Sequence, residues 1–356
     1  MTQSPVYIAR PTIRINEDAY ALLNELLLGM RMTESEGGLS ALELRFSNWA
    51  SDTTGSANYA FEDGDILALG AAITVYAGDE HSPQEIFRGV ITGLEADFPR
   101  GGPPEITVLA EDALQRLRLA RRSKTYENVS IADIANQIAQ AAGIQANVDG
   151  FEDTSGVYVQ MNESDLAFLR RLLARYDGDL QIVGDELHIA PRGYVRRAEL
   201  TLQLHAELRA VRVLADLAQQ TTEVTVSGWD VAQGEAINVS SSGVDLGPGQ
   251  GEDGATVLRD TLGERAEHVG HLAAATQAEA QAIADSAFDQ RARRFLVLEG
   301  TTEGNPQLRV GAHVEIGGLG PRFSNTYYVT RVCHRYDLVN GYETDFEGGC
   351  GYWGRD

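Results

Sequence analysis

The chain has 356 residues, which is enough for two or three domains. Its 52 acidic residues outnumber its 29 basic residues, and the formal net charge is −23 at pH 7. This excess excludes sequence-specific nucleic-acid binding and disfavours an anionic membrane surface, because both need concentrated lysine and arginine. The acidity does not indicate disorder, since 43% of the residues are hydrophobic. The sequence contains neither a run of about 18 apolar residues nor a secretory signal pattern, so no membrane partner is expected.

The first 120 residues have the pattern of a β-domain. Short stretches with apolar residues at alternate positions predict strands. A Pro-Arg-Gly-Gly-Pro-Pro loop at 99–104 separates two of them, and a short basic helix at 112–119 ends the region. Many short strands with glycine and proline between them predict a small barrel or sandwich. The predicted strands are 7–15, 41–46, 66–76, 86–94 and 105–110.

The hydrophobic period changes to that of a helix at Ser130. Ile131, Ile134 and Ile138 share one helical face, Ser130 is a good N-cap, and Gly143 is placed to end the helix. A strand at 157–161, a second amphipathic helix at 162–176 and a hairpin at 180–190 follow. These elements predict a compact α/β module.

The β-pattern returns at 200–229, and a long polar loop covers 240–254. Thr276 opens another helix, and β-structure resumes at 295. We therefore predict a mixed β and α+β fold, with two small β-barrels and an inserted α/β module. The first barrel is 1–120, the module is 121–196 plus about 240–294, and the second barrel is about 197–239 plus 295–356. We find no convincing internal repeat in the sequence, and whether the two β-rich regions share a fold stays open.

One group of residues has the types that bind zinc. Glu264, His268 and His271 could share a face if the segment were helical. The spacing differs from the His-Glu-x-x-His pattern of metalloproteases, so a solvated helix is the favoured interpretation. We therefore predict no metal ligands.

Other chemical motifs are also missing. The glycine-rich stretches 247–254 and 317–320 lack the residues of phosphate-binding loops, and we interpret them as linker or turn. Neither a Gly-x-Ser-x-Gly elbow nor a local cysteine signature is present, so we predict no catalytic or cofactor-binding residues and no enzyme activity. We interpret Cys333 and Cys350 as two reduced thiols, and the alternative is a single disulfide between them.

A basic cluster stands out against the acidic background. Its two interpretations are a solvated helix end and a protein-binding patch for an acidic neighbour or a second copy of the chain. The cluster comprises Arg116, Arg118, Arg121, Arg122 and Lys124.

Two longer stretches are specific enough to compare with known families. Residues 159–179 combine a strand, an Asn-Glu-Ser-Asp turn and a Phe-Leu-Arg-Arg-Leu helix. Residues 304–336 combine a Pro-x-Leu-x-x-Gly entry, a Gly-x-Gly turn, a Phe-Ser turn and a Tyr-Tyr-Val-Thr-x-Val-x-His strand. Together with the order barrel, module, barrel, they resemble the phage late control D and VgrG N-terminal (gp27-like) tail hub family.

This resemblance implies a structural baseplate hub. Such hubs are homotrimers in which two similar barrels per chain present a pseudo-sixfold ring to a hexameric tail tube or tube initiator. The opposite end holds a trimeric spike, and other baseplate proteins bind around the hub. The particle assembles in the bacterial cytoplasm. The alternatives from other classes are a peptidoglycan-degrading tail-tip enzyme and a carbohydrate-binding module.

VgrG chains continue into a spike, whereas this sequence stops at 356. We therefore expect a separate spike polypeptide, which favours a contractile phage tail, a tailocin or an extracellular contractile injection system. The acidic charge suggests a lumen or outer wall that repels DNA or acidic cargo. Solubility of an assembly component is the competing explanation.

Overall fold

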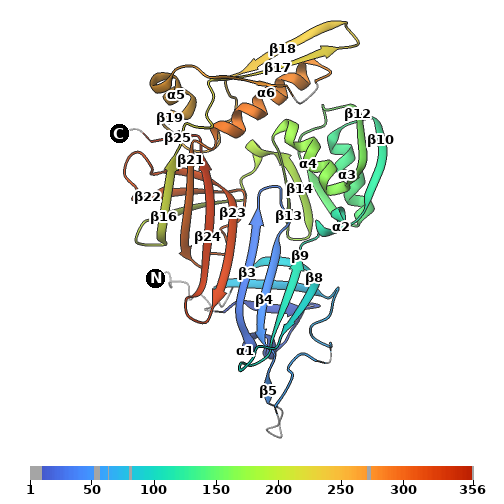
Figure 1. The fold of residues 1–356 in the computed structure, drawn as a ribbon, viewed down its shortest axis with the longest axis vertical. Coiled ribbons are helices and arrows are strands. Elements are labelled where there is room, and N and C mark those ends of the chain that lie inside the picture. The colour runs from blue at the N-terminus through green and yellow to red at the C-terminus, as the bar shows by residue number, and fades with distance from the viewer. Residues whose placement is uncertain (1–9, 52–56, 63, 80–81, 271–273, 355–356) are drawn as a thin grey trace.

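The structure is a computed structural model that describes residues 10–51, 57–62, 64–79, 82–270 and 274–354. Its ribbon is elongated, with β-structure at the lower end and in the middle and a helix-backed hairpin at the upper end (Figure 1). The fold is a β-rich mixture of strands and helices, as predicted. Among the described residues, no helix is long and apolar enough to cross a membrane.

A 13-stranded sheet runs through both β-rich regions. Its strands in the N-terminal region are β1 (Thr12–Ile15), β2 (Asp18–Ala19), β3 (Leu27–Ser35), β4 (Ala41–Ser47), β7 (Ala72–Asp79), β8 (Ser82–Asp97) and β9 (Glu105–Glu111). Its strands in the C-terminal region are β15 (Ala198–Gln203), β16 (Leu208–Ala215), β21 (Leu296–Glu303), β22 (Ala312–Gly317), β23 (Asn325–Asp337) and β24 (Gly341–Cys350). Helix α1 (Ala21–Leu26) and the short strands β5 (Ala50–Ser51) and β6 (Ala57–Asn58) lie outside this sheet.

The two regions are joined by antiparallel pairing of β23 with β3, from Arg331 opposite Ser35 to Asp337 opposite Gly29. We call this pairing the seam. The sequence predicted two separate barrels, but one sheet continues across the seam, and no pairing among the described residues closes either half into a barrel. The physical reason is the length of β23, whose first part pairs with β22 and whose second part needs another partner for its backbone groups.

Both halves of the sheet have the same strand topology. The path β3-β4-β9-β8-β7 in the first half matches the path β16-β21-β24-β23-β22 in the second. The matched strands also follow one another in the same order along the chain, with the fourth and fifth strands forming a hairpin in both halves. The chain therefore contains an internal structural repeat, which we had not found in the sequence.

Turn geometry confirms the repeat at single residues. Gly70 lies before β7 and Gly311 lies before β22, which are equivalent strands of the two repeats. Their φ values are 84° and 85°. The Gly70 N–H donates to the carbonyl of Ile91 at 2.8 Å, and the Gly311 N–H donates to the carbonyl of Val329 at 2.9 Å. Left-handed backbone favours glycine at both positions.

The bulges of the two hairpins match as well. The register shifts around Thr92 in the first hairpin and around Thr330 in the second. The Thr92 hydroxyl donates to the carbonyl of Leu109 at 3.4 Å, and the Thr330 hydroxyl donates to the carbonyl of Glu347 at 3.3 Å. The equivalence of Thr92 with Thr330 aligns the two repeats residue by residue.

The α/β module lies beside the sheet and contains the two predicted helices (Figure 1). Ser130 and Asp133 form a reciprocal capping box, and Gly143 ends the first helix at φ 67°. Tyr126 stacks on Phe168 within the module core. The elements are α2 (Gln115–Arg118), β10 (Arg121–Val129), α3 (Ile131–Ala142), β11 (Gln145–Val148), β12 (Gly156–Ser164), α4 (Asp165–Leu173), β13 (Gly178–Val183) and β14 (Glu186–Pro191), with 3₁₀ turns at Ala174–Tyr176 and Arg192–Tyr194.

A second insertion, between β16 and β21, forms the upper end of the molecule. Its elements are β17 (Glu223–Asp230), β18 (Glu235–Ser241), β19 (Glu252–Asp253), α5 (Gly254–Leu262), β20 (Ala266–Val269) and α6 (Gln277–Ala292), and β19 pairs with β25 (Tyr352–Trp353). The hairpin of β17 and β18 pairs with β20 and covers α6.

The sequence had placed residues up to 239 with the second barrel. The structure differs because the inward faces of β17 and β18 pack on α6 rather than on the large sheet. Val224 and Val226 share a core cluster with Ile283 and Phe288 of α6. The helix start predicted at Thr276 is confirmed, since the Thr276 hydroxyl accepts the N–H of Glu279.

Candidate functional site

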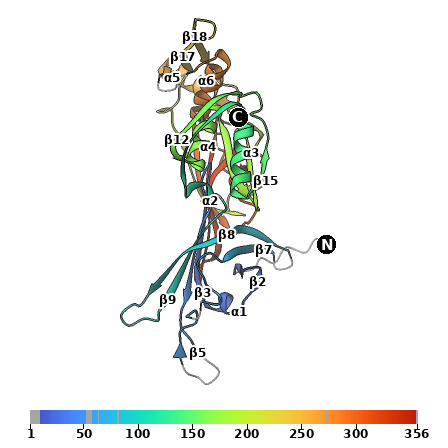
Figure 2. The same cartoon turned by 90° about the vertical axis from the view of Figure 1, so that its right-hand side faces the viewer.

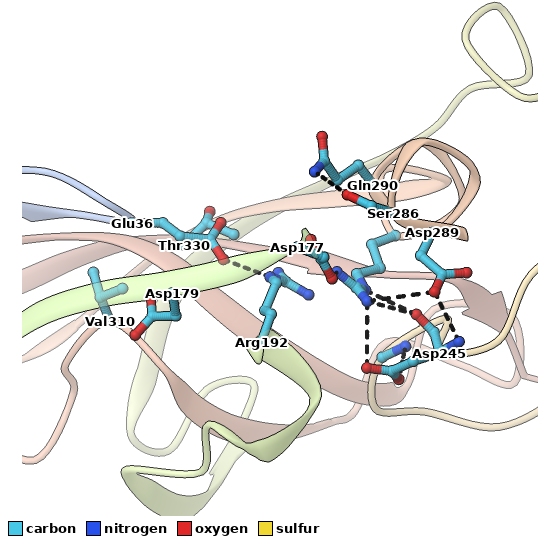
Figure 3. A network of polar contacts seen from close by, with 12 residues as sticks. Glu36, Asp177, Asp179, Arg192, Asp245, Ser286, Asp289, Gln290, Val310 and Thr330 are labelled. Atoms are coloured by element: carbon cyan, nitrogen blue, oxygen red, sulfur yellow. Dashed lines mark hydrogen bonds and ion pairs between the residues drawn. The ribbon is translucent and has the colours of Figure 1, made fainter. Parts of the chain in front are cut away.

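Buried arginines and acids gather where the sheet, the α/β module and α6 meet, and we call this cluster the polar junction (Figure 3). Arg293, at the end of α6, has a side chain only 5% exposed. Its guanidinium contacts the carboxylates of Asp177 and Asp289 and donates to the carbonyl of Asp245 at 2.7 Å. One side chain thus ties three segments together that lie far apart in the sequence. The polar junction comprises Glu34, Glu36, Asp177, Asp179, Gln181, Arg192, Arg197, Asp245, Asp289, Arg293 and Arg309.

Arg192 makes the next contact of the junction. Its Nε lies 2.5 Å from a carboxylate oxygen of Glu36, and its guanidinium lies 3.8 Å from the ring centroid of Tyr328. A planar guanidinium can make an ion pair and stack on an aromatic ring at the same time. Arg192 therefore fixes the end of the α/β module against β23 and against the residue that follows β3.

Two further pairs complete the junction. Glu34, 1% exposed, accepts from the Nε of Arg309 at 2.6 Å and from the side-chain amide of Gln181 at 2.7 Å. Arg197 contacts the carboxylate of Asp179. Because guanidinium groups stay charged and these acids are already paired, the junction is built to hold parts in position rather than to transfer protons.

Among the acids and histidines outside these ion pairs, Asp112 and His334 have strongly shifted pKa values. Burial raises the pKa of Asp112 to about 6, although its oxygens accept the N–H groups of Ser40 and Leu114 at 2.7 and 2.9 Å. Burial also lowers the pKa of His334 to about 3, and its Nδ1 lies 2.9 Å from the hydroxyl of Tyr342. Both side chains hold local structure, Asp112 at the start of α2 and His334 inside the sheet.

A cavity of about 950 Å³ beside the junction opens between the loop 245–251 and strands β22 and β23. His313 lines it, and burial together with Arg196 and Arg192 lowers the pKa of this histidine. Its wall includes Gly247, and residues 247–251 form a loop as interpreted, whereas Glu252–Asp253 form β19 and Gly254 begins α5. The second stretch, 317–320, forms the turn between β22 and β23.

Of the three zinc candidates, His268 lies on a strand, which corrects the expectation of a helix at this position. His268 lies in β20 with its Nδ1 3.1 Å from the hydroxyl of Thr225, and Glu264 precedes that strand. His271 lies outside the described residues. Within the described part of the chain, no group of three potential ligands gathers around a common point.

The basic cluster lies on α2 and β10; β10 forms the outer edge of the α/β module, and α2 lies at the lower end of the module (Figure 1). Arg118 pairs with Glu111, and Arg122 lies 3.3 Å from Asp165. Lys124 sits 4.2 Å from the ring centroid of Tyr126. Local partners therefore account for much of the positive charge of this cluster.

Both cysteines are free thiols, as expected. Cys350 is buried at the end of β24, and burial raises its pKa to about 12. Burial also raises the pKa of Cys333, which lies half-buried in β23. Neither thiol has the lowered pKa of a nucleophile.

The sequence did not indicate the two unpaired edges of the sheet. Residues 92–97 of β8 pair with β9 but have no partner strand on their other side among the described residues. Strand β16 pairs with β21, and the one further pairing that it makes within the described part of the chain is an isolated bridge of Leu208 to Leu204. Figure 2 shows β8 and β9 extending from the body as a long hairpin. Matching the two repeats would have identified these edges.

Solved structures with this fold are phage tail proteins and a secretion-system component. The 43 kDa tail protein of prophage MuSo2 from Shewanella oneidensis superimposes with a TM-score of 0.72 at 15% identity, covering 95% of this chain and 97% of its own. The tail protein of Neisseria meningitidis MC58 gives 0.68 at 11% identity, with 96% of each chain covered.

The E. coli c3393 protein, a type VI secretion component similar to the T4 tail proteins gp27 and gp5, gives 0.60 at 14% identity, covering 97% of this chain and 79% of its own. The chain thus has the gp27-like tail hub fold that its sequence motifs predicted. No curated protein matches the sequence significantly. Residues 51–337 match the family model of the Alg8 N-terminal domain, and the chain belongs to this family.

Proposed function

We propose that the protein is a structural baseplate hub, a homotrimer with pseudo-sixfold symmetry that joins a hexameric tail tube to a trimeric spike. The observation that carries the proposal is the internal repeat. Each chain contributes two halves of one sheet that have the same topology and are joined edge to edge by the seam. Three copies around one axis would present six equivalent units at one end and three at the other.

The polar junction supports a positioning role. It locks the α/β module and the α6 region against the seam side of the sheet, because its ion pairs cross between all three parts. A rigid frame of this kind suits a protein that transmits load between a tube and a spike. The gp27-like fold supports binding rather than catalysis as the function.

In this proposal the chain has three parts. Residues 1–120 form the first β-unit, and residues 121–196 form the α/β module. The second β-unit takes the remainder of the large sheet, while the insertion with α6 joins the module. Each β-unit becomes a small barrel-like element of the ring.

The proposed partners are the second and third copies, a trimeric spike protein, the tube or its initiator protein, and other baseplate proteins. The proposed place is a particle assembled in the bacterial cytoplasm. The fold is shared with prophage tail proteins and with a secretion-system component. Phage tail, tailocin and extracellular injection system are therefore the particles to consider.

Mass photometry of the purified chain, alone and co-expressed with the spike protein of its own particle, tests the proposal. A trimer has three times the 38.6 kDa mass of one chain, and a spike-bound trimer adds the mass of one spike. A chain that stays monomeric and binds no spike under both conditions contradicts the proposed function.

A further inference from the structure

The seam inside the chain shows how one repeat unit joins the next. The second half of β23, beyond its bulge at Thr330, pairs with β3 of the first repeat. The same part of β8, beyond its bulge at Thr92, is the unpaired edge 92–97. The topological equivalent of β3 is β16, the free strand at the other end of the sheet. An unpaired strand edge is a template for pairing with another chain.

The residue alignment of the repeats fixes a register between these two edges. In the seam, Arg335 lies opposite Arg31. Counting from the matched threonines, Asp97 is equivalent to Arg335. The register of β3 shifts between Leu27 and Gly29, and that of β16 shifts between Leu208 and Ala210. Counting from these two shifts, Arg212 is equivalent to Arg31. The same register, applied between copies, therefore places Asp97 opposite Arg212.

We propose that residues 92–97 of β8 pair antiparallel with β16 of a second copy, with Asp97 of one copy opposite Arg212 of the next. The inference rests on the proposed function, because it names the surface through which the trimer closes. The contact is head-to-tail, with different edges on the two copies, so three copies close into a ring when the rotation is threefold.

The charges of the two edges are complementary. Residues 92–97 carry Glu95 and Asp97 and no base, whereas β16 carries Arg209 and Arg212 and no acid. Among the described contacts, no ion pair involves Glu95 or Asp97. Arg212 is 76% exposed, and its loose contact with Glu299 at 3.7 Å leaves it free to bind a carboxylate. Pairing of two β8 edges with each other would put like charges together, so charge also selects against the wrong partner.

The apolar residues of the two edges fit the same register. Leu94, 37% exposed, lies opposite the buried Val108 of β9, on the face of the hairpin that carries core residues. Phe98, 64% exposed, directly follows the end of β8. In the proposed register they face Ala215 and Val211, which are half-buried at the β16 edge. Pairing would therefore remove exposed apolar surface from water on one side of the sheet and neutralise charge on the other.

The first experiment exchanges the proposed charge pair in the full-length protein. Asp97→Arg puts two arginines opposite each other, and Arg212→Asp puts two aspartates opposite each other. We expect each single variant to raise the protein concentration needed for half-trimer by about tenfold or more, since three interfaces per ring are affected. The double variant D97R/R212D restores the pair with reversed polarity and is expected to return to the wild-type concentration.

The matched control reverses two acids on strands away from these edges. Glu235 of β18 and Glu315 of β22 are exposed and make no ion pair among the described contacts. The variant E235K/E315K makes the chain less acidic without touching β8 or β16, and we expect it to assemble like the wild type. Circular dichroism of every variant verifies folding.

A cysteine pair tests the register directly. In the proposed register, position 96 of one copy lies opposite position 213 of the next, so the test pair is Ala96→Cys with Val213→Cys. The control pair is Ala96→Cys with Ala210→Cys, because position 210 is three residues away from position 213. Within one chain the two edges are seven strand spacings apart, about 34 Å along the sheet, so a disulfide reports a contact between copies. We expect oxidised trimers on a non-reducing gel for the first pair and not for the second.

The outcomes separate the two proposals. A wild-type trimer that the single charge variants do not weaken, or that D97R/R212D fails to restore, overturns the edge pairing while the hub function stands. A wild-type chain that never trimerises contradicts the proposed function itself. Restoration by the double variant together with the disulfide at 96 and 213 supports the pairing.

Discussion

At the residue scale, His334 is a buried neutral imidazole that lowers the free energy of unfolding as the pH falls. Burial holds its pKa near 3, far below the ordinary value of 6.5. Between pH 6.5 and pH 3 the unfolded chain therefore binds a proton that the folded chain does not, so stability falls as pH falls through this range. By pH 4 this contribution amounts to about 3 kcal/mol.

We predict that His334→Gln reduces the pH dependence of stability. Glutamine can accept the hydroxyl hydrogen of Tyr342 and does not titrate. Urea unfolding at pH 7 and pH 4 gives the loss on acidification for each protein, and the wild type is expected to lose more. Asp112, whose pKa is raised to about 6, gains stability on acidification in both proteins and cancels in the comparison. An equal loss in both proteins argues against the histidine as the cause.

Arg293 offers a second test at the same scale, with its neighbour as the control. Arg293→Ala leaves Asp177 and Asp289 without their buried cation, so we predict a loss of about 3–5 kcal/mol. Arg294 is exposed and has no ion pair among the described contacts. Arg294→Ala should therefore change the free energy of unfolding, measured by urea denaturation, by less than about 0.5 kcal/mol. Similar effects of the two variants would mean that the polar junction does not stabilise the fold.

At the scale of elements, the two equivalent glycines make a matched pair for measuring the repeat. Gly70 and Gly311 have the same φ and the same hydrogen bond, but their surroundings differ. A Cβ on Gly70 meets nothing within 4 Å, whereas a Cβ on Gly311 would lie 2.5 Å from Arg197 and 2.7 Å from Val195.

We predict that Gly70→Ala costs about 1 kcal/mol from backbone strain alone. Gly311→Ala adds steric overlap with Val195 and Arg197, and should cost measurably more. Thermal unfolding of both variants against the wild type gives the comparison. A larger cost for Gly70→Ala would contradict the assignment of the crowded site to the second repeat.

Local sequence signals predicted some elements well and others not at all. Helices α3 and α6 were predictable because Ser130, Gly143 and Thr276 mark their ends chemically. The segment of β20 was predicted as helix because a strand of four residues is too short to show an alternating hydrophobic pattern. Its partner strand β17 lies 43 residues earlier in the chain, so no local signal indicates the pairing. Strand periodicity shows which face is buried but not which strand is the neighbour, so the seam and the free edges were out of reach.

At the scale of the whole molecule, the repeat explains what the sequence could and could not show. The Gly-Ala pair just before β7 (Gly70-Ala71) recurs at the start of β22 (Gly311-Ala312), but the rest of the two repeats diverges in sequence, because each repeat carries different insertions and meets different neighbours. The family resemblance predicted two similar β-units, and the fold bears out that similarity in topology. It did not predict that one sheet would pass through both units.

The net charge of −23 makes assembly of three copies electrostatically costly at long range, while the Asp97–Arg212 pair would act only at contact. Raising the salt concentration from about 0.05 M to about 0.5 M shortens the screening length from over 10 Å to a few ångströms, and so removes mostly the long-range repulsion. We therefore predict that the wild type reaches half-trimer at a lower protein concentration in high salt. In D97R, local repulsion is partly screened as well, so its defect relative to the wild type should shrink. Mass photometry at both salt concentrations measures the two effects. A trimer that weakens with salt would mean that charge attraction at the contacts between copies outweighs the repulsion between the acidic chains.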